Sequence, residues 1–224
     1  MHKSVWINRC RHRCDLTLFF PDPPKLGIQT KVRRVFRIVR AREHKLTTWK
    51  NGLGVTSEIA VHPAGANLDD FDWRVSMAQV GADGPFSIFA DVDRHLAVLE
   101  GRLRLEIAGR PPLELSPGSP TAEFPGDVPV TASVVDGPVT DLNVMTRRGR
   151  ATARLQRLHI DTPLERAVAA TTLLLSRAGG LRLVCADRTD VLDVNDAVIS
   201  RGKTDRHMRL EPQGPSVAFL IELT

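Results

Sequence analysis

Short segments in which apolar and polar residues alternate constrain the fold of this chain more than any other feature. Residues 73–77 and 102–107 place apolar side chains at every second position, and residues 55–61 do so with Ser57 as an exception. A period of two is the period of a β-strand with one buried face. Residues 96–99 are apolar at every position, which predicts a strand buried between two layers. Glycine and proline separate these segments, so the sequence predicts an all-β sandwich or barrel.

One segment departs from this pattern. Residues 163–170 resemble a helix, because Thr162 suits an N-cap and Pro163 suits the first helical position. We therefore expect one helix in an otherwise β-rich chain.

The chain also contains an internal repeat. Gly101-Arg-Leu-Arg-Leu and the following Leu113-Glu-Leu recur about 79 residues later as Gly180-Leu-Arg-Leu and Leu192-Asp-Val. Duplication of one small β-lobe explains the repeat, although glycine-flanked apolar strands also resemble one another by chance. We divide the chain into a leader (residues 1–31), an N-terminal lobe (residues 32–150) and a C-terminal lobe (residues 151–224), between which strands can be shared.

The positive charge is concentrated at one end. Residues 1–40 hold ten Lys and Arg against two Asp, whereas residues 41–224 hold 21 basic against 24 acidic residues. A nucleic-acid-binding protein carries its basic patch on the folded module, and this chain has no Tyr for base stacking. We therefore expect no nucleic-acid partner. Residues 1–31, which are rich in Arg and include three closely spaced prolines, are interpreted as an unstructured leader.

The cysteines and the hydropathy indicate a compartment. Cys10 and Cys14 lie in the leader and Cys185 lies in an apolar run, so no disulfide framework is apparent. The two leader cysteines flank His12, but no second ligand pair follows at zinc-finger spacing. No run approaches the roughly eighteen apolar residues of a membrane span. These features predict a cytoplasmic protein without a membrane partner.

Six motifs follow one another along the chain. They are Trp49-Lys-Asn-Gly-Leu-Gly-Val-Thr, Trp73-Arg-Val-Ser, Asp83-Gly-Pro-Phe-Ser, Asp93-Arg leading to Leu99-Glu-Gly, Phe124-Pro-Gly-Asp, and Asp141-Leu-Asn-Val-Met. Taken singly, several of these are ordinary turns or strand ends. As an ordered series over about residues 34–223, they resemble the motifs of the HutD/Ves family.

This resemblance implies a bicupin, in which two cupin-like antiparallel β-sandwich or barrel lobes pack together. It also implies a link to histidine utilisation and stress responses, a pocket for formylglutamate or a related small acidic metabolite, and no established catalytic activity. Carried over motif by motif, the ligand-binding candidates are Lys50, Asn51, Thr56, Arg74, Ser76, Ser87, Arg94, Asp141 and Asn143.

The chain departs from the metal-binding pattern of ordinary cupins. They hold a metal through a His-x-His pair, a Glu and a distant His, whereas the corresponding stretch here is Asp93-Arg94-His95 followed by Glu100. No histidine occurs between His95 and His159. One imidazole with carboxylates gives too few ligands for a zinc or iron site. We therefore predict neither a metal nor another cofactor.

The two arginines among the candidates favour an acidic ligand. A guanidinium in a partly dry pocket holds a carboxylate through two hydrogen bonds, so Arg74 and Arg94 suit a dicarboxylate. In the alternative, these arginines form internal salt bridges, for instance between Arg94 and Asp141. A separate alternative is that the face that carries Arg74 and Ser76 points to solvent.

Three functions are compatible with these features. The first is a non-catalytic, regulatory protein that binds a small carboxylate. The second is a metal-independent isomerase or lyase with His95 and Asp141 as acid and base. The third is a structural protein. Pairing through exposed sheet edges, for example as a homodimer, is expected under each of them.

Overall fold

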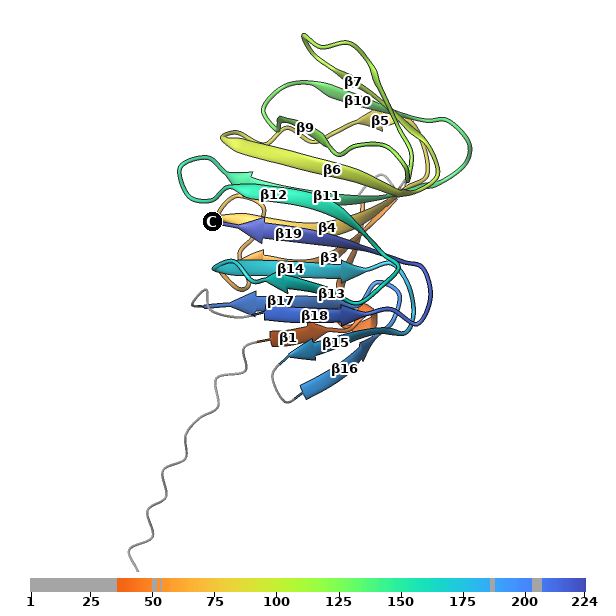
Figure 1. Cartoon of the computed structure of the whole chain (residues 1–224). Helices are drawn as coiled ribbons and strands as arrows, with labels where there is room; N and C mark the ends of the chain where they lie inside the picture. The colour runs from red at the N-terminus through yellow and green to blue at the C-terminus, as the bar shows by residue number, and fades with distance from the viewer. Residues whose placement is uncertain (1–35, 50–51, 53, 186–187, 203–206) are drawn as a thin grey trace, which may run out of the picture. The chain divides into compact units, whose positions relative to one another are not determined.

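The computed structural model describes residues 36–49, 52, 54–185, 188–202 and 207–224 (Figure 1). The predicted leader and the candidates Lys50 and Asn51 lie outside these residues. The described part of the chain is nearly all β, as predicted, and its one helical segment is the 3₁₀ turn η1 (Ala41–Glu43). Within this part, no helix is long and apolar enough to cross a membrane.

Two antiparallel sheets form what we call the first sandwich. The larger sheet has the strand order β2 (Lys45–Thr48), β3 (Gly54–His62), β4 (Trp73–Val80), β11 (Val139–Arg147), β6 (Val92–Glu100), β9 (Ala122–Pro125). The smaller sheet has the order β5 (Gly84–Pro85), β10 (Val130–Val134), β7 (Leu103–Ile107), β8 (Leu113–Leu115). Leucines and valines from both sheets form a common core between them.

Two further sheets form the second sandwich. The larger has the order β1 (Phe36–Val39), β17 (Ala197–Arg201), β14 (Thr171–Ser176), β19 (Ser216–Leu223), β12 (Ala153–Ile160). The smaller has the order β13 (Leu164–Ala167), β18 (His207–Glu211), β15 (Leu181–Cys185), β16 (Arg188–Leu192). Their shared core is again aliphatic.

The two sandwiches repeat one topology. The orders β4-β11-β6-β9 and β5-β10-β7-β8 of the first recur as β12-β19-β14-β17 and β13-β18-β15-β16 in the second, with each strand eight places later in the chain. The repeat found in the sequence falls on β7 and β15, which hold equivalent positions in this scheme. Strands β2 and β3 extend the first sandwich, whereas β1 adds to the second.

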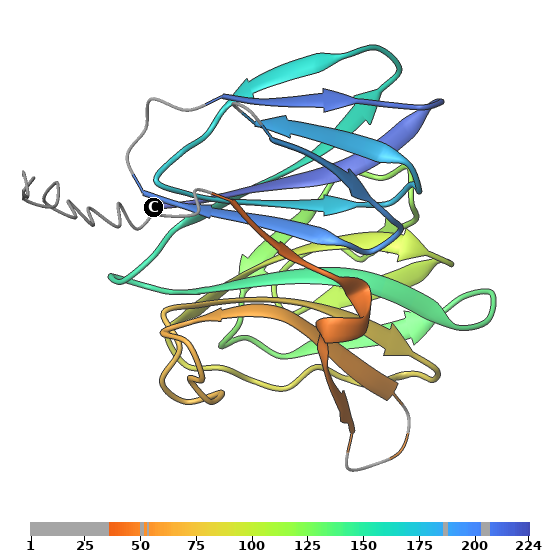
Figure 2. The same ribbon diagram turned by 90° about the horizontal axis from the view of Figure 1, so that it is seen from below.

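The two large sheets pack face to face. Residues of β4, β6 and β11 share one core with residues of β14, β17 and β19. Strand β6 lies between two cores, because Leu96 and Val98 enter the core of the first sandwich while Ala97 and Leu99 enter the core between the large sheets. This arrangement confirms the prediction of a strand buried on both faces. Figure 2 shows the orange segment of β1 and η1 passing from the blue strands towards the yellow ones.

The prediction of a helix over residues 163–170 is wrong. Leu164–Ala167 is instead the edge strand β13, which pairs antiparallel with β18 in the register Leu164↔Leu210. The local cap and proline signals for a helix are weak compared with the backbone hydrogen bonds that β18 offers.

The prediction of strict alternation over residues 55–61 is also wrong for the last residues of this segment. The register of β3 against β4 shifts between Glu58 and Ala60. Ile59 therefore packs in the core between the large sheets, whereas Val61 packs on the opposite face against Phe71 and Met145. One extra residue in a strand reverses the faces of all that follow.

Candidate functional site

The interior of the first sandwich contains a cluster of polar side chains, which we call the interior cluster. It comprises Arg74 and Ser76 of β4, Arg94 of β6, and Asp141 and Asn143 of β11. Directly opposed residues of antiparallel strands share a face. Asn143 opposes Ser76, and Met145 opposes both arginines. On β4 and β11, the apolar neighbours of these residues point the other way, into the core between the large sheets.

The surroundings of the interior cluster are apolar. The smaller sheet presents fully buried Leu103 and Leu105 to the same interior, and Phe124 of β9 lies on the cluster's own sheet. Charges in such a medium interact more strongly than in water, and each unpaired charge there carries a desolvation cost.

Arg74 has a partner inside the protein. Its Nε donates a hydrogen bond to Glu58 Oε2 at 2.7 Å, and its Nη1 lies 3.4 Å from Ser76 Oγ. Both members of the ion pair are largely buried. Glu58 was not among the residues selected from the sequence, although its position two residues after Thr56 on one strand would have placed both on one face.

Arg94 has no such partner. Only 6% of its surface is exposed, yet its side chain forms no ion pair or hydrogen bond with any described residue, and its buried Nε is without an acceptor there. Its guanidinium carbon lies 4.6 Å from the ring centre of Phe86 and 5.4 Å from that of Phe124. Burial lowers the pKa of Arg94 to about 10 despite the nearby charge of Asp141, so the side chain is a cation at neutral pH.

Asp141 and Asn143 complete the cluster. Each has a buried Oδ1 without a hydrogen-bond donor among the described residues. Burial raises the pKa of Asp141 to about 7, and the charge of Arg94 opposes this shift. No Arg94–Asp141 ion pair forms. The alternative of an internal salt bridge is therefore wrong for this pair, whereas Arg74 does form one with Glu58.

Of the two remaining candidates, Thr56 lies on the same face of the sheet as the cluster, whereas Ser87 lies outside the sheet. Thr56 opposes Ala78, which in turn opposes Asp141, so Thr56 lies on the cluster's face of the sheet. Its hydroxyl accepts a hydrogen bond from the indole N–H of Trp49 at 2.8 Å. Ser87 is exposed in the segment after β5, and no side-chain hydrogen bond joins it to the other described candidates.

The interior of the second sandwich is different. The equivalent strands β12, β14 and β19 present Leu158, Leu174, Ala218 and Leu220 to that interior, together with the leucines of β15. Among the described residues, the first sandwich buries the charged side chains of Arg94 and Asp141 on the strands that face its core, whereas the second buries Asp196 just before β17 begins.

His95 faces away from the interior cluster. It opposes Val144 on the other side of the sheet, and its Nδ1 lies 3.3 Å from Glu123 Oε1. His95 and Asp141 therefore cannot act together on one ligand. No group of three or more His, Cys, Asp or Glu side chains in the described residues is arranged to hold a metal ion.

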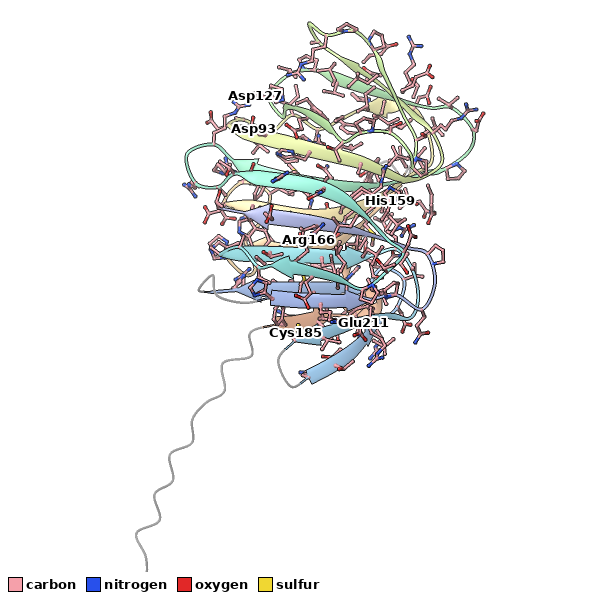
Figure 3. All side chains as sticks on the ribbon, viewed as in Figure 1. Asp93, Asp127, His159, Arg166, Cys185 and Glu211 are labelled. Carbon is pink, nitrogen blue, oxygen red and sulfur yellow. The ribbon has the colours of Figure 1, made fainter. Side chains whose placement is uncertain are left out.

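Acidic residues of two motifs have a structural role. Arg148 Nε lies 2.8 Å from Asp93 Oδ1, and its Nη1 lies 2.7 Å from Asp127 Oδ2. Figure 3 shows the two aspartates close together at one end of the first sandwich. Cys185, also labelled there, is a free thiol whose pKa is raised to about 11 by burial and by the charge of Asp190, so it is not a thiolate nucleophile at neutral pH.

Comparison with known proteins identifies relatives of this chain. The HutD family model matches residues 41–219. A 21.2 kDa protein encoded 3′ of hutC in Pseudomonas putida is 33% identical over 180 residues, which cover 80% of this chain and 93% of the relative. Protein Ves of Citrobacter koseri is 37% identical over 117 residues, which cover 51% of this chain and 60% of the relative.

Solved structures give the same result. A conserved protein of unknown function from Pseudomonas aeruginosa PAO1 is 34% identical, with a TM-score of 0.76 over 84% of this chain and 98% of the other. HutD from Pseudomonas fluorescens SBW25 is 30% identical, with a TM-score of 0.72 over the same shares. A cupin 2 conserved barrel domain protein from Leptotrichia buccalis, 9% identical with a TM-score of 0.53, shares the fold alone. The chain belongs to the HutD family, which is linked to the histidine-utilisation region.

Proposed function

We propose that this chain binds a small carboxylate at the interior cluster and acts as a non-catalytic, regulatory protein in histidine or other amino-acid catabolism. The single observation that carries the proposal is the buried guanidinium of Arg94, which lacks a partner among the described residues. Burying an unpaired charge destabilises a fold. An anionic ligand that pairs with Arg94 would offset this cost.

The residues around Arg94 suit one carboxylate better than two. Arg94 offers paired N–H donors for a planar carboxylate, and Ser76 and the Asn143 amide offer further donors. Arg74 is already held by Glu58. A second carboxylate would have to displace Glu58, so we expect formate or the single acidic end of a larger metabolite to bind at Arg94.

The family supports the metabolic side of the proposal. The P. putida relative is named from its place beside hutC, and the structure of P. fluorescens HutD is that of a formate condition. A formylglutamate-like acid is therefore the metabolite class to test. We also place the protein in the cytoplasm, as its cysteine pattern predicts.

Thermal unfolding of the full chain with sodium formate, N-formylglutamate or sodium chloride tests the proposal. A ligand at one hundred times its Kd adds about 2.7 kcal/mol of stability, which raises the Tm by several degrees. We expect Arg94→Met to abolish the rise, and Arg102→Met, at an exposed arginine that pairs with Asp136, to keep it. If no acid raises the Tm of the wild type above the chloride control, the proposal is wrong.

Asp141 favours one alternative function. A carboxyl group with a pKa of about 7 can act as a proton carrier in an isomerase or lyase that needs no metal. This alternative requires turnover. NMR spectra of formylglutamate incubated with the protein in D₂O would show loss of the α-proton signal or a new product, and Asp141→Asn would stop the change.

A further inference from the structure

A cavity of about 380 Å³ lies at the outer edge of β3, and we call it the edge groove. None of the five residues of the interior cluster lines it, although Glu58, the partner of Arg74, does. Strands β1 and β17 of the second sandwich and β3 of the first all contribute to its lining. Its volume is within the range of about 300–1,000 Å³ that is typical of small-molecule sites.

One wall of the edge groove is an unpaired strand edge. Strand β2 pairs with β3 only from Val55 to Glu58. Beyond Glu58, the outer edge of β3 has no partner strand among the described residues, and Ala60 and Val61 of this stretch line the groove. An open strand edge offers backbone N–H and C=O groups for hydrogen bonding.

Three cationic side chains line the groove. Arg37, Lys45 and Arg201 have no carboxylate of the described residues within 4.0 Å. Arg37 opposes Ile199 on the neighbouring strand, so Arg201, two residues further on, shares its face. Burial lowers the pKa of Arg201, and the positive charge of Arg37 adds to the effect. The Arg201 guanidinium lies 5.1 Å from the ring centre of Trp73.

The two acidic side chains of the lining are already engaged. Glu58 accepts the hydrogen bond from Arg74, and Glu43 Oε2 accepts one from the backbone N–H of Arg40 at 3.1 Å. Arg74 balances the charge of Glu58, whereas Glu43 keeps its negative charge, so the three cations of the lining outnumber its unbalanced carboxylate. The apolar part of the lining is provided by Val39, Ile59 and Ile199, which belong to the core between the large sheets.

We propose that the edge groove is a second ligand site, distinct from the interior cluster, for an organic anion that combines one carboxylate with an apolar body. The carboxylate pairs with Arg37 and Arg201, which can each donate two hydrogen bonds to it. The apolar body packs on Val39, Ile59 and Ile199. An anion without an apolar part, or an apolar molecule without a charge, lacks half of these contacts.

Titration of the ¹⁵N-labelled full chain with benzoate, followed by amide chemical shifts, tests this proposal. Acetate and benzyl alcohol serve as probes that lack the apolar body and the charge. We expect benzoate to shift the amides of Ala60, Val61 and Ile199, and each control probe to bind at least tenfold more weakly.

Variants separate this site from the interior cluster. The double substitution Arg37→Gln with Arg201→Gln changes two exposed side chains, and we expect it to weaken benzoate binding at least tenfold. Arg94→Met and Arg102→Gln should leave it unchanged. The proposal is overturned if benzoate shifts no amides, if it shifts only amides elsewhere, or if the double variant binds it with equal affinity. The Tm response to formate tests the interior cluster, and its outcome does not decide this proposal.

Discussion

Glu58 and Arg74 are joined by a 2.7 Å hydrogen bond inside the first sandwich, and this pairing leaves Arg94 as the interior arginine without a carboxylate among the described residues. The two arginines share one apolar compartment, so the difference between them lies in their partners. Arg74 is held within the fold by Glu58, whereas Arg94 is the arginine to which we assign the ligand in the proposed function.

Replacing Glu58 should destabilise the fold. Glu58→Gln leaves the largely buried Arg74 without its counter-charge, and loss of one partner of such a pair costs about 1–3 kcal/mol. Urea denaturation measures this loss. Glu106→Gln is the matched control, because Glu106 pairs with Arg104 at the exposed surface, where such pairs contribute about 0–1 kcal/mol. Equal stability of the two variants would show that the interior pair is not a structural element.

Replacing Arg94 should have the opposite effect on the ligand-free protein. Arg94→Met keeps a flexible, unbranched side chain that can still fill part of the space beside Phe86 and Phe124, but it removes the guanidinium that lies over their rings and with it an unpaired buried charge. We expect unfolding free energy to be unchanged or raised by about 1–2 kcal/mol, as for other buried charges replaced by apolar groups. A loss above 2 kcal/mol in urea denaturation would instead assign Arg94 a structural role.

Much of this architecture follows from the sequence, and the exceptions have physical causes. Alternation places Arg74 and Ser76 opposite Trp73 and Val75, but it cannot tell a sandwich interior from solvent. The answer depends on the smaller sheet, whose strands are distant in sequence. The bulge after Glu58 likewise could not be predicted from the sequence, because one extra residue in a strand does not change the local preference for β structure.

The motif around Trp49 depends on a glycine at position 54. A Cβ atom there would lie 2.6 Å from the carbonyl oxygen of Gln79 and 2.9 Å from the Trp49 ring. Gly54→Ala must therefore displace the indole that donates to Thr56. We expect a loss of about 1–3 kcal/mol and a change in tryptophan fluorescence. Gly118→Ala is the control, since no atom approaches that position within 4 Å, and a similar loss there would remove the steric explanation.

Asp196 joins the start of the fold to the second sandwich. Its carboxylate accepts hydrogen bonds from Arg40 at 2.7 Å, from the Ala41 N–H at 2.9 Å and from the Asp193 N–H at 3.0 Å. Burial alone would raise the pKa of Asp196, but these bonds lower it below its usual value. Asp196→Ala should cost about 2–4 kcal/mol and raise amide exchange in β1. Unchanged exchange in β1 would argue against this anchoring role.

The pKa of Asp141 predicts a pH dependence with a definite sign. The folded value of about 7 exceeds the ordinary value of 3.8, so the native state binds more protons than the unfolded state between these limits. The contribution of Asp141 to the unfolding free energy of the protein is therefore greatest below pH 3.8. It falls by on the order of a few kcal/mol as the pH rises to about 7.

Asp141→Asn removes this titration while keeping the shape of the side chain. The difference in unfolding free energy between variant and wild type should grow in favour of the variant from pH 4 to pH 7 and stay constant above it. Formate should also bind the wild type more tightly as pH falls through 7, because protonation of Asp141 removes a negative charge beside Arg94. A pH-independent difference between the two proteins would mean that Asp141 stays ionised in the folded protein. Asp141 would then provide the counter-charge for Arg94 inside the first sandwich, and this would exclude an anionic ligand.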